Sequence, residues 1–152
     1  TLTTFVVDDE QLARDELMLF CHRTSPFAER RTVDWKALEG EPLVTLTRDS
    51  GIRLLTEVGF ESAGIELVPV HEVGHITTAI ALVEAGLGVA VLPTYALAAA
   101  RNGALTGRPL AAPTIAREIH LIHASGRSVS PAVAAFTPIL RRCVQRLKPG
   151  SD

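Results

Sequence analysis

The stretch from residue 65 to residue 93 most constrains the fold, because its apolar pattern changes from extended to helical and back. Residues 65–73, IELVPVHEV, are rich in β-formers and predict a strand. A helix is expected from about His75 to Ala85, followed by Gly86 in the position of a left-handed C-cap. GVAVLP at 88–93 then predicts a short strand. The residues that fall on one face of the predicted helix are Ile76, Ala79, Ile80 and Val83.

Two further helices are predicted from capping residues and apolar spacing. One runs from about Asp49 through about Ala63, opening with N-cap residue types and followed by Gly64. The other follows Ser130, with Pro131 at its first position. The residues expected on their inner sides are Ile52, Leu55 and Val58 in the first helix, and Val133, Phe136, Leu140, Val144 and Leu147 in the last.

Apolar and β-branched runs predict the remaining strands. Residues 8–16 are polar and predict a turn or a short helix, and 95 to about 107 is Ala-rich and predicts a helix at first. The stretch 108–118 contains two prolines and predicts a loop. Because strands alternate with helices through the middle of the chain, the fold class is α/β with a substantially parallel sheet. The further predicted strands lie at 1–7, 17–21, 42–46 and 118–124.

Composition and charge exclude several classes of function. The 152 residues carry a formal net charge of −2, which gives no electrostatic case for nucleic-acid binding by this segment itself. Cys21 and Cys143 are far apart in apolar settings, which predicts two buried thiols in a reducing compartment. No signal peptide opens the chain, and Glu84 and two glycines interrupt the longest apolar stretch, so no membrane span is predicted. Since Thr1 already lies in a β-prone run, we expect a piece of a longer protein.

The sequence HEVGH at 71–75 matches the H-E-x-x-H signature of zinc proteases. Catalytic zinc would need His71 and His75 one turn apart on one helix, with Glu72 beside them. The β-prone run before the motif and the glycine inside it instead predict a strand-to-helix junction. Glu84, the nearest candidate for a third ligand, is expected to be an ordinary exposed carboxylate. We therefore predict no catalytic residue, metal or cofactor.

Two strand-to-helix junctions, LTRDSG at 46–51 and EVGHITT at 72–78, form a candidate ligand site. Free N–H groups and the positive end of each helix dipole favour an anion, most simply a carboxylate metabolite, at the carboxyl edge of the sheet. Each residue also has a structural interpretation, with Ser50 as an N-cap, Thr77 as a first-turn residue and Arg48 as a surface charge; the convergence of the junctions favours a site. The candidate effector-binding residues are Thr45, Thr47, Arg48, Ser50, Gly74, His75 and Thr77.

Three segments resemble the effector-binding domain of LysR-type transcriptional regulators, and together they cover nearly the whole chain. They are residues 15–44, residues 72–97 and residues 105–141. The specific part is AGLGVAVLP at 85–93, which follows the family pattern L-V-x-x-G-x-G-[IV]-x-[LV]-[LV]-P. SPFA and SPAVAAF, in the first and last segments, support the resemblance.

The resemblance implies a type 2 periplasmic-binding-protein fold, with two α/β lobes around a cleft and two crossing strands as hinge. Residues 1–7 would be the first crossing, and the region after Pro93 the second. The whole chain, 1–152, would be a partial effector-binding domain, with about 8–93 in the second lobe and about 109–148 returning to the first. The rest of the first lobe, the linker helix and the winged helix-turn-helix are absent from this sequence.

The resemblance also implies a regulatory function without catalysis. Family effectors are small molecules, often carboxylates or amino-acid-like, that bind between the lobes and change the lobe and dimer arrangement. Family contacts in this lobe come from the loop after the 42–46 strand, here Thr45 to Ser50, and from the EVGHITT turn, which are the two junctions named above. DNA would be contacted only through the absent N-terminal domain of a cytoplasmic homodimer or tetramer, with no membrane partner.

Two alternatives remain open on the sequence. One is a transport-type solute-binding protein of the same architecture. The other is a zinc hydrolase using His71, Glu72 and His75. Stoichiometric zinc, with activity lost on His71→Ala, would distinguish the hydrolase from both ligand-binding proteins.

Overall fold

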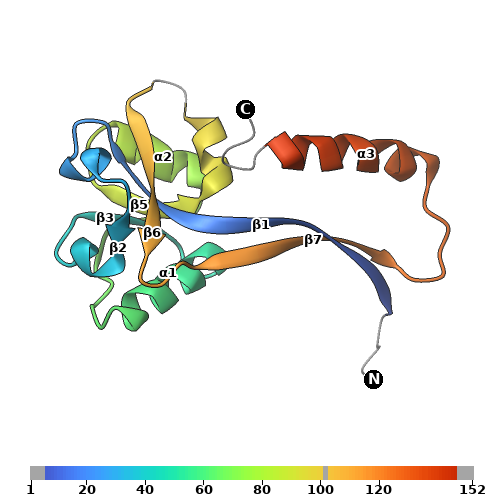
Figure 1. Ribbon diagram of the computed structural model, residues 1–152, viewed down its shortest axis with the longest axis horizontal. Coiled ribbons are helices and arrows are strands. Elements are labelled where there is room, and N and C mark those ends of the chain that lie inside the picture. The colour runs from blue at the N-terminus through green and yellow to red at the C-terminus, as the bar shows by residue number, and fades with distance from the viewer. Residues whose placement is uncertain (1–5, 101–102, 147–152) are drawn as a thin grey trace. The chain divides into compact units, whose positions relative to one another are not determined.

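The chain divides into two compact units in the computed structural model, which describes residues 6–100 and 103–146 (Figure 1). The larger unit is formed by residues 16–116, and the smaller by the residues up to Asp15 together with those from Arg117 onward. Two strands, β1 (Val7–His22) and β7 (Ala116–Ala124), contribute residues to both units. The strand expected at 1–7 lies almost wholly outside the described residues.

The larger unit is built on a mixed sheet with the strand order β2-β6-β1-β5-β3-β4. The expected parallel pairing holds for β3 with β4 and with β5, and also for β2 with β6. In contrast, β1 runs antiparallel to β5 and to β6, and β7 also pairs with β1, outside this order. The strands introduced here are β2 (Val33–Asp34), β3 (Leu43–Leu46), β4 (Pro69–Val73), β5 (Val89–Pro93) and β6 (Leu105–Ala111).

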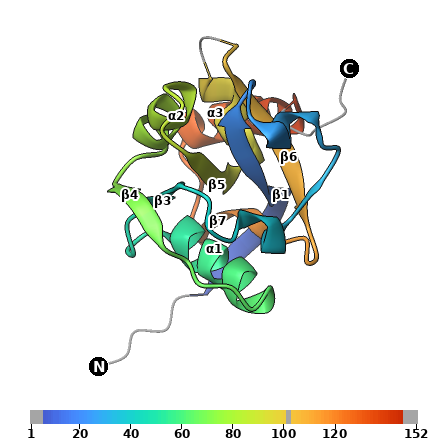
Figure 2. The ribbon, with the colours of Figure 1, turned by 90° about the vertical axis from the view of Figure 1, so that its left-hand side faces the viewer.

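Two helices lie on opposite sides of this sheet, α1 (Gly51–Ser62) and α2 (Ile76–Glu84) (Figures 1 and 2). Both lie where the apolar spacing and the caps predict helices. Gly64 and Gly86, which follow them, adopt φ of 65° and 75°, a conformation that favours glycine over residues with a Cβ. Three short 3-10 helices complete the unit: η1 (Pro26–Glu29), η2 (Trp35–Leu38) and η3 (Thr94–Ala99).

The core of the larger unit is centred on Trp35. Its side chain is fully buried, its ring meets Phe60 edge-on with 5.9 Å between the ring centroids, and Nε1 donates to the carbonyl oxygen of Pro113 at 2.8 Å. A buried indole needs such a partner for its N–H group. The largest other fully buried side chains are Phe20, Phe60, Leu17, Leu19, Leu38, Leu92 and Leu110.

Two segments predicted as turn or loop are wholly or mostly strand. Residues 8–16 belong to β1, where the polar residues pair across to other elements instead of closing a turn. In the stretch 108–118, residues 108–111 belong to β6 and 116–118 to β7, and only 112–115 between them form the predicted loop. Pro109 is compatible with β6, because β2 pairs only with Leu110 and Ala111 and leaves the proline a strand neighbour on one side only.

The inner face of α1 also differs from its prediction. Val58 is 49% exposed, and the fully buried positions are Ile52, Arg53, Thr56, Gly59 and Phe60. The prediction counted apolar residues alone, whereas the buried face is completed by an arginine and a threonine that have hydrogen-bond partners, and by a glycine against the Trp35 ring.

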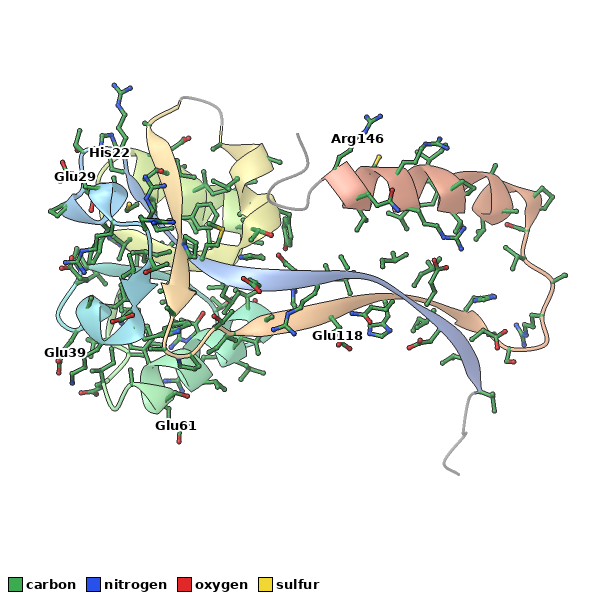
Figure 3. The ribbon with its side chains drawn as sticks, viewed as in Figure 1. His22, Glu29, Glu39, Glu61, Glu118 and Arg146 are labelled. Carbon is green, nitrogen blue, oxygen red and sulfur yellow. The ribbon has the colours of Figure 1, made fainter. Side chains whose placement is uncertain are left out.

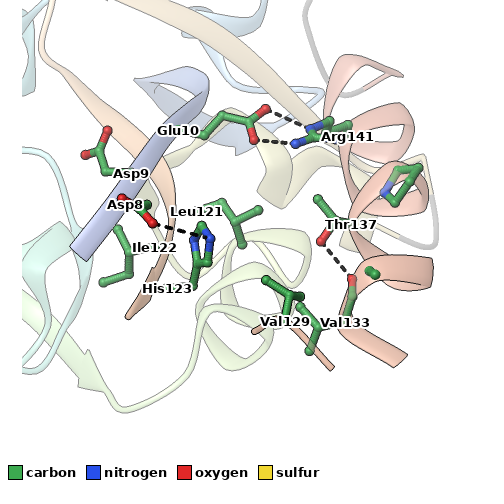
Figure 4. Close-up of a pocket in the computed structure, with 12 residues that line it drawn as sticks. Asp8, Asp9, Glu10, Leu121, Ile122, His123, Val129, Val133, Thr137 and Arg141 are labelled. Carbon is green, nitrogen blue, oxygen red and sulfur yellow. Dashed lines mark hydrogen bonds and ion pairs between the residues drawn. The ribbon is translucent and has the colours of Figure 1, made fainter. Parts of the chain in front are cut away.

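The smaller unit consists of the first part of β1, most of β7 and α3 (Pro131–Arg146) (Figure 4). The acidic residues at the start of β1 form ion pairs with β7 and α3: Asp9 with His120 at 2.9 Å, Asp8 with His123 at 3.9 Å, and Glu10 with Arg141. A cavity of about 500 Å³ lies among these elements.

The predicted inner stripe of α3 is largely exposed. Val133 is 47% exposed and Phe136 56% exposed, whereas Leu140 and Val144 are half-buried and Leu147 lies outside the described residues. Cys143 on the same helix is also exposed, so only Cys21 is the buried thiol that the sequence predicted. The spacing identified a real helix, but the described residues do not cover its apolar face.

Candidate functional site

The first junction of the candidate site connects β3 to α1. Thr45 is buried near the end of β3, and the Thr47 N–H donates to the carbonyl oxygen of Val73 at 3.0 Å. Ser50 is the N-cap of α1, and its hydroxyl accepts from the N–H of Ile52 at 3.3 Å. This bond fulfils the structural interpretation of Ser50 and satisfies one of the N–H groups at the start of the helix.

The second junction connects β4 to α2. β4 ends at Val73, and His75 occupies the N-cap of α2 with extended backbone and no side-chain capping bond. Gly74, His75 and Thr77 are exposed. The carbonyl oxygen of His75 accepts hydrogen bonds from the N–H groups of Thr78 and Ala79. The N–H groups of Ile76 and Thr77, in the first turn, therefore point out of the helix, where they could donate to an anion.

The two junctions lie side by side at one edge of the sheet. β3 and β4 are parallel, with Thr45 opposite Glu72 and Leu46 opposite Val73, so both strands end at the same level. The Thr47–Val73 hydrogen bond extends that pairing into the turns. The structure therefore brings the two groups of predicted residues together, as parallel strands followed by helices require.

A buried arginine that the sequence analysis missed lies beneath both junctions. Arg53 in α1 is 3% exposed, and its Nη1 donates to Thr45 Oγ1 at 2.8 Å, to the Leu46 carbonyl at 3.1 Å and to Glu72 Oε2 at 2.7 Å. Its Nε donates to Glu57 Oε1 at 2.9 Å. The i, i+4 spacing of Arg53 and Glu57 is the one sequence signal that could have indicated it.

Charges at the rim of the site are mixed in sign. Arg48 and Asp49 are both exposed next to the first junction. The Thr47 hydroxyl donates to the Asp49 carboxylate and, with the Asp49 backbone N–H, holds the pKa of that carboxyl below its usual value. Asp49 is therefore ionised at neutral pH, and the Thr47 hydroxyl is already engaged. A ligand anion at this edge would rely on Arg48 and on the N–H groups more than on Thr47.

HEVGH does not form the helical arrangement that a zinc protease needs. His71 lies in β4, while His75 is the N-cap of α2, so the two rings are not one turn apart on one helix face. Within residues 6–100 and 103–146, no three His, Cys, Asp or Glu side chains are grouped to hold a metal ion. Glu84 is half-buried at the end of α2, with one carboxylate oxygen fully buried. The prediction that Glu84 is an ordinary exposed carboxylate is therefore wrong.

Fold and site together define a class of protein. A mixed sheet with helices on both sides, whose parallel strands end in adjacent helix N-termini, is the architecture of an α/β ligand-binding domain. Residues 7–144 match the family model of the LysR substrate binding domain, and the chain belongs to this family. Its fold is accordingly the type 2 periplasmic-binding-protein fold expected from the sequence.

Related sequences are named as transcriptional regulators. The chain is 33% identical over 139 residues to the HTH-type transcriptional regulator YbhD of Escherichia coli K12, which is itself uncharacterised. This match covers 91% of this chain and 44% of that relative. It is 30% identical over 148 residues to a probable nitrogen assimilation transcriptional activator of Synechococcus elongatus, covering 95% and 47%. The chain thus spans less than half the length of these relatives.

Solved structures share the fold at low sequence identity. The CcmR regulatory domain of Synechocystis PCC6803 in complex with 2-PG superposes with a TM-score of 0.77 at 18% identity, over 95% of this chain and 70% of that one. The effector binding domain of QuiR in complex with shikimate gives 0.69 at 20% identity, over 92% and 66%. The chain is therefore the effector-binding part of a LysR-type regulator by family, and these structures support its fold.

In the part of the chain that the structure describes, no helix has the length and apolar character to span a membrane.

Proposed function

We propose that this chain senses a small anionic metabolite, most simply a carboxylate, at the adjoining β3–α1 and β4–α2 junctions. The observation that carries the proposal is the register of β3 and β4, which ends both strands at one edge and sets two helix N-termini next to each other. The ligands in two related structures, 2-PG and shikimate, are small molecules. The proposed contacts are Thr45, Thr47, Arg48, Ser50, Gly74, His75 and Thr77.

The whole protein is proposed to be a cytoplasmic transcriptional regulator that contacts DNA through a separate N-terminal domain and performs no catalysis. The names of its relatives and the family support this proposal. Ligand would act by favouring one lobe or subunit arrangement over another, because an effector can shift an equilibrium only by its difference in affinity for the two states. The assignment of residues about 8–93 to the second lobe and about 109–148 to the first remains a prediction.

A homodimer or tetramer is also proposed. Exposed apolar side chains occur on α1, at Leu54 and Val58, and on the segment that follows it into β4, at Val68 and Val70. An apolar surface of this kind is a candidate subunit interface. Light scattering of the 152-residue chain and of a Val58→Glu variant would test this proposal. A smaller oligomer in the variant supports the surface, and an unchanged mass excludes it.

A thermal-shift screen against carboxylate metabolites tests the effector proposal. A ligand at one hundred times its Kd should stabilise the folded state by about 2.7 kcal/mol. The same ligand should stabilise a Thr77→Val variant less, because that variant lacks a hydroxyl at the site. Stabilisation that is equal in wild type and in Thr77→Val and Arg48→Ala variants would place the ligand elsewhere and contradict the proposal.

A further inference from the structure

Arg53 connects the two junctions to α1. Its guanidinium donates to Thr45 in β3, to Glu72 in β4 and to Glu57 in α1, so one buried side chain contacts three elements of the larger unit. Glu57 and Glu72 are each about two-fifths exposed, with side-chain accessibilities of 40% and 41%, while Arg53 itself is 3% exposed. The cation is thus inside the unit, and its two carboxylate partners lie at the surface.

The position of Arg53 bridges the ends of the two strands. Thr45 and Glu72 are opposite each other in the register of β3 and β4, one residue before each strand ends. Arg53 Nη1 reaches both side chains, at 2.8 Å and 2.7 Å. A buried guanidinium is poorly solvated, so it holds to its acceptors more firmly than an exposed cation does. The separation of the two strand ends is therefore constrained by side chains as well as by backbone hydrogen bonds.

The same contact orients the hydroxyl of Thr45. A threonine hydroxyl has one hydrogen to donate and lone pairs to accept with. Since Thr45 Oγ1 accepts from Arg53, its hydrogen remains available for another acceptor. Because Thr45 is only 6% exposed, the contact holds its side chain inside the larger unit.

We propose that Arg53 is a positioning residue of the effector site: it fixes the spacing of the β3 and β4 ends, from which the two junctions start. The inference rests on the proposed function for the meaning of the site. Its test uses no ligand, so the two proposals can fail separately.

The amide of Thr47 is a direct reporter, because it donates to the Val73 carbonyl across the gap between the junctions. Hydrogen exchange of this amide is measured in the 152-residue chain relative to the Val91 amide in β5, in the same sample. The variants are Arg53→Lys, which shortens the bridge, and Glu57→Ala, which removes a partner of Arg53 on α1. The matched control is Glu61→Ala, one turn further along α1, where the side chain points away from the sheet (Figure 3).

We expect the Thr47-to-Val91 exchange ratio to rise about tenfold or more in Arg53→Lys, as for loss of a charge-assisted hydrogen bond. A smaller rise, of about threefold, is expected in Glu57→Ala, and none in Glu61→Ala. A purely structural role would accelerate both amides together and leave the ratio unchanged. An unchanged ratio in Glu57→Ala, or an equal rise in Glu61→Ala, overturns the proposal even if Arg53→Lys does not fold.

Discussion

Helices α1 and α2 of the larger unit and helix α3 of the smaller unit have similar sequence patterns and different surroundings. All three show apolar residues at helical spacing, and all three are helices. In α1 and α2 one face is buried, whereas no side chain of α3 is fully buried within the described residues. The comparison shows that apolar spacing predicts where a helix forms, while burial depends on whether the chain supplies a partner for its face.

The reactivity of the two cysteines gives the largest expected difference between the units. Cys21 is fully buried, and burial raises the pKa of its thiol. The reagent therefore cannot easily reach this thiol, and little of it is in the reactive thiolate form. Cys143 is exposed on α3. We expect Cys143 to react with Ellman's reagent at least about 100-fold faster than Cys21 in the native protein. Single Cys→Ser variants assign the two phases, and two fast phases would contradict the packing of the larger unit.

Truncation of one aromatic residue in each unit measures the difference in stability. Trp35→Ala should lower the free energy of unfolding by about 3–5 kcal/mol, because the indole is fully buried and hydrogen-bonded. Phe136→Ala in α3 should change it by less than about 0.5 kcal/mol, since that ring is 56% exposed. Urea denaturation followed by circular dichroism provides both values. A cost for Phe136→Ala near that of Trp35→Ala would show that the α3 face is covered in solution.

Glycine substitutions in α1 sharpen the same point at the scale of one methyl group. A Cβ on Gly59 would lie 2.4 Å from carbons of the buried Trp35 ring, so Gly59→Ala should cost about 1–3 kcal/mol. Gly51→Ala places its Cβ in open space and should leave stability unchanged or raise it by up to about 1 kcal/mol. We expect Gly59→Ala to lower the midpoint of thermal unfolding, and Gly51→Ala to leave it unchanged or raise it.

The smallest expected effect concerns pH in the smaller unit. Hydrogen bonding to Glu118, together with the Asp9 carboxylate, raises the pKa of His120 above its ordinary value of 6.5. Since the folded pKa is the higher one, the stabilisation is fully present below about pH 6.5 and is lost as the pH rises through the raised value. Exchange of the β7 amides should therefore quicken as the pH rises above about 6.5 in wild type, after correction for intrinsic rates. A His120→Gln variant should lose this pH dependence; if it keeps the full dependence, another group is responsible.

Much of the larger unit could be predicted from the sequence, because its signals are local. Gly64 and Gly86 marked the ends of α1 and α2, and the extended run before Ile76 marked the β4–α2 junction. Errors arose where long-range pairing decides the structure. Residues 8–16 form a strand because β7 pairs with β1, and side chains of the acidic run then find partners on β7 and α3.

The candidate site was predicted in outline, and its buried support was not. The sequence indicated both junctions, because caps and strand ends are local features. Arg53 could not be placed under them, since its burial depends on Thr45 and Glu72, eight and nineteen residues away in the chain. An arginine in a helix is ordinarily assigned to the surface.

The adjoining junctions as the effector site are the central claim, and an amide NMR titration tests it most directly. The ligand is the carboxylate that gives the largest thermal shift in the screen. We expect the amide signals of Thr47, His75 and Thr77 to move first and furthest, because Thr47 lies in the β3–α1 turn and the other two lie at the start of α2. If these signals stay fixed while others, such as those around the cavity between β7 and α3, move with saturation, the effector binds elsewhere and the claim is wrong.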